Sequence, residues 1–133
     1  MIGTTLVMLF VQGRQAASIH SGDSRCYIVR DDELAMVTKD HTRLIPHKDG
    51  ERKVLSKALC APGELSLEVK RFEVRERDVF LLCSDGFYEN LPHTVIKNGM
   101  SEASLEKGMA YMSSMVLKGD ATDNLTATLV AFE

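Results

Sequence analysis

The stretch Asp78-Val-Phe-Leu-Leu-Cys-Ser-Asp-Gly-Phe-Tyr-Glu-Asn-Leu91 decides how the rest of the chain is arranged. Its run Val79–Cys83 is apolar and uncharged, which predicts a strand buried on both faces. The run stops at Ser84-Asp85-Gly86, so a carboxylate stands at a strand end where glycine permits a sharp turn. Residues 87–91 predict one helical turn, with Glu89 on the same side as Asp85. Alone, the stretch fits either a solvated acidic turn or two carboxylates that face one spot.

Length and charge limit the classes of protein that this sequence can represent. At 133 residues the chain is long enough for a single domain that buries about two-thirds of its unfolded surface and folds without disulfides or structural metal ions. The net charge is −3 and acids are interspersed with bases, so no basic field for nucleic acid and no polybasic membrane segment is expected. Any phosphate chemistry must therefore depend on a local site.

The three cysteines indicate a reducing compartment. Cys26, Cys60 and Cys83 are odd in number, form no CxxC pair, and two of them lie in apolar runs. We expect buried thiols, no disulfide and a cytoplasmic protein. The apolar run Leu6–Val11 lacks a basic flank and is too short for a signal peptide or a membrane span.

Short apolar or alternating runs separated by turn residues predict an antiparallel meander. The first of them begins almost at Met1, although a domain rarely starts in the middle of a strand. The expected strands are residues 3–11, 15–20, 25–29, 34–38, 64–71, 79–83 and 125–132.

Helices are expected mainly in the last third of the chain. Residues 92–98 predict a helical turn, and 101–117 a helix behind a Ser101 cap, with a methionine stripe that we expect to pack in the core. Residues 39–51 predict a loop, and 52–59 a short helix. Mostly strands with late helices indicate an α+β domain built on antiparallel sheet.

Three acidic turns follow apolar strands: Gly22-Asp23-Ser24, Ser84-Asp85-Gly86 and Thr122-Asp123-Asn124. In such turns a carboxylate can approach a cation without a clash from the backbone. An all-oxygen ligand set favours Mg²⁺ or Mn²⁺ over Zn²⁺. Three turn aspartates are also ordinary in a domain of this size, so composition leaves the structural alternative open.

Five short motifs occur in order along the chain: Gly-Asp-Ser-Arg with a following aromatic (22–27), Thr-Lys-Asp-His-Thr (38–42), Leu-Ser-Lys-Ala-Leu (55–59), Leu-Leu-Cys-Ser-Asp-Gly (81–86) and Asp-Asn-Leu-Thr (123–126). Together they resemble the motifs of the PP2C-type, metal-dependent protein serine/threonine phosphatases, in their compact bacterial form. The resemblance extends from about Gly3 to Phe132 and implies two antiparallel sheets in a sandwich flanked by helices, with a two-metal cluster at one end.

The resemblance also implies the site. Asp85 and Asp123 match the aspartates that ligate the metal cluster, and Asp23 and Glu89 match positions of a third, weaker metal site. Two metals, or three in the complete domain, would be Mn²⁺ or Mg²⁺ and would activate a water that attacks phosphorus without a phosphoenzyme. No catalytic group beyond the metal ligands is implied.

Two further motif residues favour structural roles. Arg25 begins a strand, so we expect it to anchor the turn through acidic neighbours rather than to clamp phosphate. His41 has no partner assigned by the sequence, and we expect it to fix a loop rather than act as a general acid.

The sequence also departs from the family pattern. The family carries, ahead of the first strand found here, an N-terminal section with a phosphate-binding Arg, an acidic pair and an Asp-Gly-x-Gly-Gly motif. The segment between Asp40 and Leu55 is short, which implies a reduced flap, and Cys60 stands where a Gly commonly follows Ala-Leu. We therefore expect residues 1–133 to form a single PP2C-like domain that is incomplete at its N-terminus, the C-terminal two-thirds.

Three classes of function follow from this comparison. The first is a phosphatase of phosphoserine and phosphothreonine proteins in its complete form; the second is an inactive module that binds or regulates phosphoproteins; the third is a fragment without activity. Partners would be phosphoproteins and a serine/threonine kinase with its substrates, with no nucleic acid or membrane. Because the missing strands would leave residues 3–11 as an exposed edge, a homo-oligomer or aggregation is expected.

Overall fold

A computed structural model of the chain describes residues 3–57, 67–119 and 123–133. Within these ranges the strands are β1 (Leu6–Gln12), β2 (Gln15–Ser21), β3 (Arg25–Arg30), β4 (Glu33–Met36), β5 (Thr42–His47), β6 (Gly50–Leu55), β7 (Glu68–Glu73), β8 (Val79–Cys83) and β9 (Ala127–Ala131), and the helices are α1 (Asp85–Tyr88), α2 (His93–Met100) and α3 (Leu105–Lys118).

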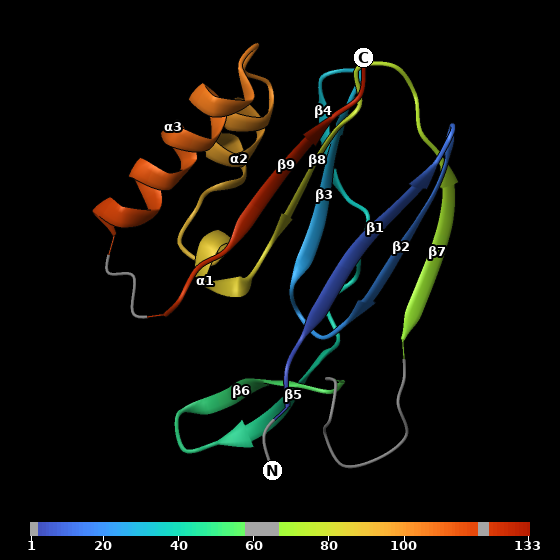
Figure 1. The fold of residues 1–133 in the computed structure, drawn as a ribbon. Coiled ribbons are helices and arrows are strands. Elements are labelled where there is room, and N and C mark those ends of the chain that lie inside the picture. Colours follow the sequence, from blue (N-terminus) through green and yellow to red (C-terminus); the bar gives the residue numbers. More distant parts are fainter. Residues whose placement is uncertain (1–2, 58–66, 120–122) are drawn as a thin grey trace.

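Two antiparallel sheets face each other, and helices cover one of them (Figure 1). The larger sheet has the order β4-β3-β8-β9 and the smaller one β1-β2-β7, while β5 and β6 pair as a separate hairpin. Helices α2 and α3 lie against the outer face of the larger sheet (Figure 1). The predicted α+β fold, an antiparallel sandwich flanked by helices, is confirmed, with the described helices on one side.

Strand β8 is the centre of this layering, as its apolar run predicts. It pairs with β3 on one side and with β9 on the other. Leu81 and Cys83 belong to the core cluster under the helices, whereas Phe80 belongs to the cluster between the sheets, where its ring lies 5.8 Å from that of Phe72. Each such buried side chain contributes about 2 kcal/mol, so β8 fixes both sheets' packing.

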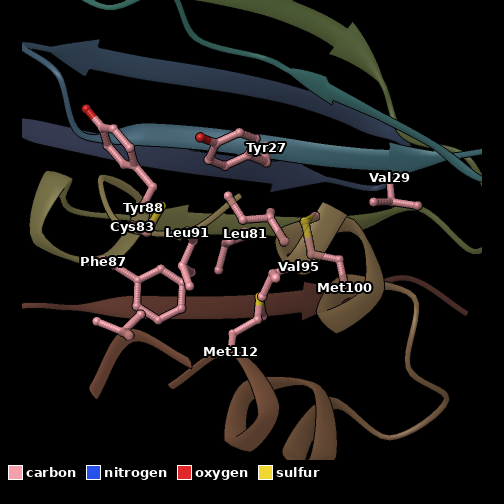
Figure 2. Packing of buried hydrophobic residues seen from close by; sticks show 12 residues of the cluster. Tyr27, Val29, Leu81, Cys83, Phe87, Tyr88, Leu91, Val95, Met100 and Met112 are labelled. Carbon is pink, nitrogen blue, oxygen red and sulfur yellow. The ribbon is translucent and has the colours of Figure 1, made fainter. Parts of the chain in front are cut away.

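Met112, the central residue of the predicted methionine stripe, lies in the core beneath the helices (Figure 2). Met112 is fully buried, and Met109 and Met115 pack against the same cluster, which confirms that the stripe is core. The predicted cap at Ser101 is wrong, because α3 begins later and the hydroxyl of Ser104 accepts the first-turn N–H of Lys107.

The segment that forms β5 and β6 differs from the prediction. Residues 42–47 were expected in a loop and residues 52–59 in a short helix, but β5 and β6 form an antiparallel hairpin with Thr42 opposite Leu55. Most of its side chains are exposed on both faces, so the hydrophobic alternation that marks a strand is absent. Cys60 and the end of the expected helix lie outside the described residues.

The outer face of the smaller sheet carries a cluster of apolar side chains. Met8, Ile19 and Val69 oppose one another across β1, β2 and β7 and therefore form a row on one face. Phe10 lies on the same face as Met8 and is 60% exposed. No described helix covers this face, and β1 is an open edge of its sheet.

Candidate metal centre

The Asp85 turn and the loop of Asp123 are in direct contact. Asp85 follows β8 as the first residue of α1. A Cβ atom added to the next residue, Gly86, would collide with the carbonyl oxygen of Asn124 and lie 3.4 Å from Cβ of Asp123. Only glycine allows this close approach, which brings two carboxylates 38 positions apart to the same end of the sandwich.

Each of these two carboxylates is held by the backbone that follows it. One oxygen of Asp85 accepts the N–H of Gly86 at 2.8 Å, and one oxygen of Asp123 accepts the N–H of Asn124 at 2.8 Å. Within the described ranges neither carboxylate forms an ion pair with Lys or Arg. Both therefore keep an oxygen that could bind a cation.

Asp23, on the turn between β2 and β3, lies in the same negative field. Burial raises the pKa of its carboxyl, and the charges of Asp85, Asp40 and Glu89 raise it further against a backbone hydrogen bond that lowers it. The charges of Asp85 and Glu89 thus reach Asp23 from a separate segment of the chain. Repulsion of this kind is relieved when a cation binds.

Among the described residues, no three of these carboxylates come close enough together to bind one bare ion. In the described part of the chain, the sole trio of His, Cys, Asp or Glu whose ligand atoms all lie within 4.8 Å is His20, His41 and Glu68. Mg²⁺ and Mn²⁺ commonly keep several waters and use one or two carboxylates directly. The all-oxygen donor set at Asp23, Asp85, Glu89 and Asp123 therefore fits a hydrated hard cation.

The trio of His20, His41 and Glu68 is a poor fit for a metal. Nδ1 of His41 accepts the N–H of Gly22 at 3.1 Å, so in the neutral ring Nε2 carries the proton. Nε2 of His20 donates to the carbonyl of Lys39 at 2.8 Å. Both protonated Nε2 atoms face the Glu68 carboxylate at 3.6 and 3.7 Å, and neither offers a lone pair to an ion.

His41 accordingly fixes the loop, as predicted. Its backbone N–H bonds the carbonyl of Gly22, its ring accepts from the same residue, and it stacks on His20 with ring centroids 4.3 Å apart. Burial and then the charge of His20 lower its pKa, which keeps the ring neutral. The sequence held no signal for its contacts with His20 and Glu68.

Arg25 anchors the turn, also as predicted. Its guanidinium donates two hydrogen bonds from Nε and one from Nη2 to the Asp40 carboxylate, the shortest at 2.7 Å, and another from Nη1 to the hydroxyl of Tyr27. Burial lowers the pKa of Arg25, but these hydrogen bonds raise it by more. The guanidinium also lies 3.7 Å from the centre of the Tyr88 ring. The guanidinium is thus held by its neighbours on the protein, which favours the structural role over a phosphate clamp.

The described cysteines are inert. Cys26 and Cys83 are free and buried, and burial raises the pKa of each thiol to about 12. Both thiols stay protonated and cannot serve as nucleophiles.

In the described residues, no helix is long and apolar enough to cross a membrane.

Comparison with known proteins agrees with the fold and the motifs. A sequence profile described as "Protein phosphatase 2C" matches residues 1–58. The serine/threonine protein phosphatase PstP of Mycobacterium tuberculosis is 29% identical over 140 residues, which cover 96% of this chain and 27% of PstP.

Solved structures match almost the whole chain. A crystal structure of M. tuberculosis PstP superposes with a TM-score of 0.87 at 29% identity and covers 98% of this chain and 60% of that one. A structure of the PstP catalytic domain in complex with two manganese ions superposes with a TM-score of 0.82 at 27% identity and is likewise covered to 60%. This chain thus spans a little over half of those structures and about a quarter of the curated relative.

The profile match, the curated relative and the structural matches agree with one another and with the ordered motifs. In sequence and fold, the chain is similar to protein phosphatase 2C proteins and corresponds to a part of their domain.

Proposed function

We propose that the complete domain of which this chain forms a part dephosphorylates phosphoserine and phosphothreonine proteins with the help of divalent metal ions. The main observation behind this proposal is that the charges of Asp85 and Glu89 act on Asp23. The close contact of Gly86 with Asn124 adds Asp123 to the same group of acids. Four carboxylates without a basic partner in the described ranges need a cation to balance them. The phosphatases to which this chain is similar support the same activity.

Each carboxylate has a role in this proposal. Asp85 and Asp123 would hold the ions of the main cluster, Mn²⁺ or Mg²⁺, and Asp23 and Glu89 would hold a third. The hydrogen bonds from Gly86 and Asn124 orient the two main carboxylates and leave an oxygen of each available to a cation. Bound divalent ions supply an activated water and neutralise phosphoryl oxygens.

The chain supplies one part of the catalytic domain. In this proposal residues 1–133 form a single unit that corresponds to the C-terminal two-thirds, and the phosphate-binding Arg and the Asp of the Asp-Gly-x-Gly-Gly motif belong to the remainder. A groove of about 340 Å³ lies between the ends of β1, β8 and β9, and its hydroxyl groups include those of Thr5, Ser24 and Thr126. This groove and the open edge of β1 could receive the remaining strands, which supports the assignment.

The proposed partners follow from the activity and the surface. The proposed substrates are phosphoserine and phosphothreonine proteins. A serine/threonine kinase that phosphorylates them is a further proposed partner. Buried, protonated thiols suit the cytoplasm. Self-association would use the apolar outer face that carries Met8, Phe10 and Val69 next to the open β1 edge.

The test is a phosphatase assay with Mn²⁺ on an aryl phosphate and a phosphothreonine peptide. The chain alone should hydrolyse these substrates slowly. Catalysis needs a further metal-binding carboxylate and a cationic side chain that orients the phosphate, and in this proposal the rest of the domain supplies both. A version extended by the rest of the domain should be active and should lose activity on Asp85→Asn. Asp31→Asn is the matched control, since Asp31 is exposed on the β3–β4 turn.

Three results would contradict the proposal. The proposed roles fail if the extended protein keeps its activity in Asp85→Asn. The proposal that the chain lacks part of the catalytic machinery is wrong if the chain alone hydrolyses the substrates rapidly and Asp85→Asn abolishes that activity. Phosphopeptide binding without turnover in the extended protein would favour the inactive binding module instead.

A further inference from the structure

Tyr88 joins two of the segments that carry the candidate metal ligands. It lies in α1 three positions after Asp85 and immediately before Glu89, and its side chain is buried. Its hydroxyl donates a hydrogen bond of 2.7 Å to the carbonyl of Asp23, 65 positions away in the sequence. The β2–β3 turn and α1 are thus tied by a single side chain.

The ring that makes this bond is itself fixed. The guanidinium of Arg25 lies 3.7 Å from the Tyr88 ring centre, a close cation–π contact. Asp40 and Tyr27 hold that guanidinium by hydrogen bonds. Burial raises the pKa of Tyr88, so its hydroxyl stays a donor near neutral pH. The tie therefore has little freedom to swing away.

This tie opposes the repulsion between the segments that it joins. Asp23 on one side faces the charges of Asp85 and Glu89 on the other. Without a cation, these charges favour separation of the turn from α1. The hydrogen bond from Tyr88 to the backbone of Asp23 holds the turn that carries Asp23 against the helix that precedes Glu89 before any ion arrives, and this preorganisation reduces the cost of binding.

We infer that Tyr88 is a positioning residue for the cation site formed by Asp23 and Glu89, an inference that rests on the proposed metal binding. Tyr88 touches no reacting group and acts through the placement of Asp23. Removal of its hydroxyl should weaken Mn²⁺ binding at this site and leave the contact between Gly86 and Asn124 unchanged.

The experiment compares Mn²⁺ titrations of the chain and its Tyr88→Phe variant by calorimetry and electron paramagnetic resonance. Tyr88→Phe keeps the ring and its stack on Arg25, so the variant should fold. Loss of one hydrogen bond should weaken the weakest Mn²⁺ step by roughly two- to tenfold. Tyr111→Phe on α3 is the matched control, because Tyr111 is 38% exposed and distant in sequence from both turns. The Mn²⁺ affinity of this variant should equal that of the wild type.

A double-mutant cycle with Asp23→Asn separates positioning from general destabilisation. If Tyr88 acts through the Asp23 carboxylate, Tyr88→Phe should have no further effect on Mn²⁺ affinity once Asp23 is Asn. Equal effects in both backgrounds, or unchanged affinity in Tyr88→Phe alone, would overturn the inference while the proposed function stands. Absence of Mn²⁺ binding by wild type would overturn the metal binding itself and the inference with it.

Discussion

Gly86 and Asn124 lie so close together that a Cβ atom at position 86 would collide with the carbonyl oxygen of Asn124. This contact is what places the carboxylate that follows β8 beside the one that precedes β9. The candidate centre therefore depends on a residue with no side chain as much as on the acids themselves.

Gly86→Ala should separate the two loops. We expect the free energy of unfolding to fall by about 1–3 kcal/mol, since the added methyl forces backbone apart, and Mn²⁺ affinity to fall with it. Urea unfolding and calorimetric Mn²⁺ titration measure both. Gly119→Ala is the control, because a Cβ there would meet nothing nearer than 3.5 Å. Wild-type Mn²⁺ affinity in Gly86→Ala would show that the contact does not shape the centre.

Asp23→Asn should stabilise the metal-free protein. The pKa of Asp23 is raised in the fold, so its ionised form is disfavoured and stability declines as pH rises past about 3.8. The amide removes that penalty, and the melting temperature in EDTA should rise. The increase produced by Mn²⁺ should shrink in the same variant. Asp31→Asn should change neither quantity; a lower melting temperature for Asp23→Asn in EDTA would refute the repulsion.

Stability should fall as pH drops below about 6.5, partly through His41. Burial and the charge of His20 lower the pKa of His41, against the opposing charge of Glu68, so the unfolded chain takes up the proton first. His41→Asn can still accept from Gly22 but cannot titrate, and the decline between pH 7 and pH 5 should be shallower. Urea unfolding across this range tests it, with exposed His47→Asn as control. An unchanged slope in His41→Asn would contradict the assignment.

Arg30→Ala should be strongly destabilising. Asp78 is 1% exposed and receives hydrogen bonds from Arg30 and from the N–H of Arg75. Burial raises the pKa of Asp78, but those bonds lower it by more, so removal of Arg30 leaves a buried charge without its ion pair. The expected loss is about 3 kcal/mol in urea unfolding.

The exposed pair of Arg14 and Glu76 provides the comparison for that loss. Arg14→Ala should cost less than about 0.5 kcal/mol, because exposed ion pairs contribute little. Similar losses in the two variants would mean that burial of Asp78 does not set its dependence on Arg30.

Phe10→Lys should suppress self-association. Phe10 is 60% exposed on the apolar face beside the open β1 edge, and a charge there discourages contact between copies. Sedimentation of the chain at increasing concentration should show association that the variant lacks. Leu44→Lys on the separate β5–β6 hairpin is the control. A wild-type chain that remains monomeric throughout would contradict this prediction.

Local sequence predicted the elements whose burial pattern is simple. The apolar run of β8 is buried on both faces because it lies between a second sheet and a helical layer, and the methionine spacing of α3 marks the face that enters the core. It failed at β5 and β6, because strands exposed on both faces carry no alternation. The fold class needed only the buried elements.

The candidate site divides along the same line. Short motifs predicted the three aspartates, and the spacing of one helical turn from Asp85 predicted Glu89. Arg25 and His41 have the structural roles expected of them. Which groups meet was decided by tertiary structure: Gly86 against Asn124, the hydroxyl of Tyr88 on Asp23, and Glu68 facing two histidines. The sequence by itself determined the chemistry of each turn, because a residue type and its neighbours along the chain suffice for that. Only the fold decided which turns share a field, because repulsion, hydrogen bonding and close packing act through distances that the order of residues does not contain.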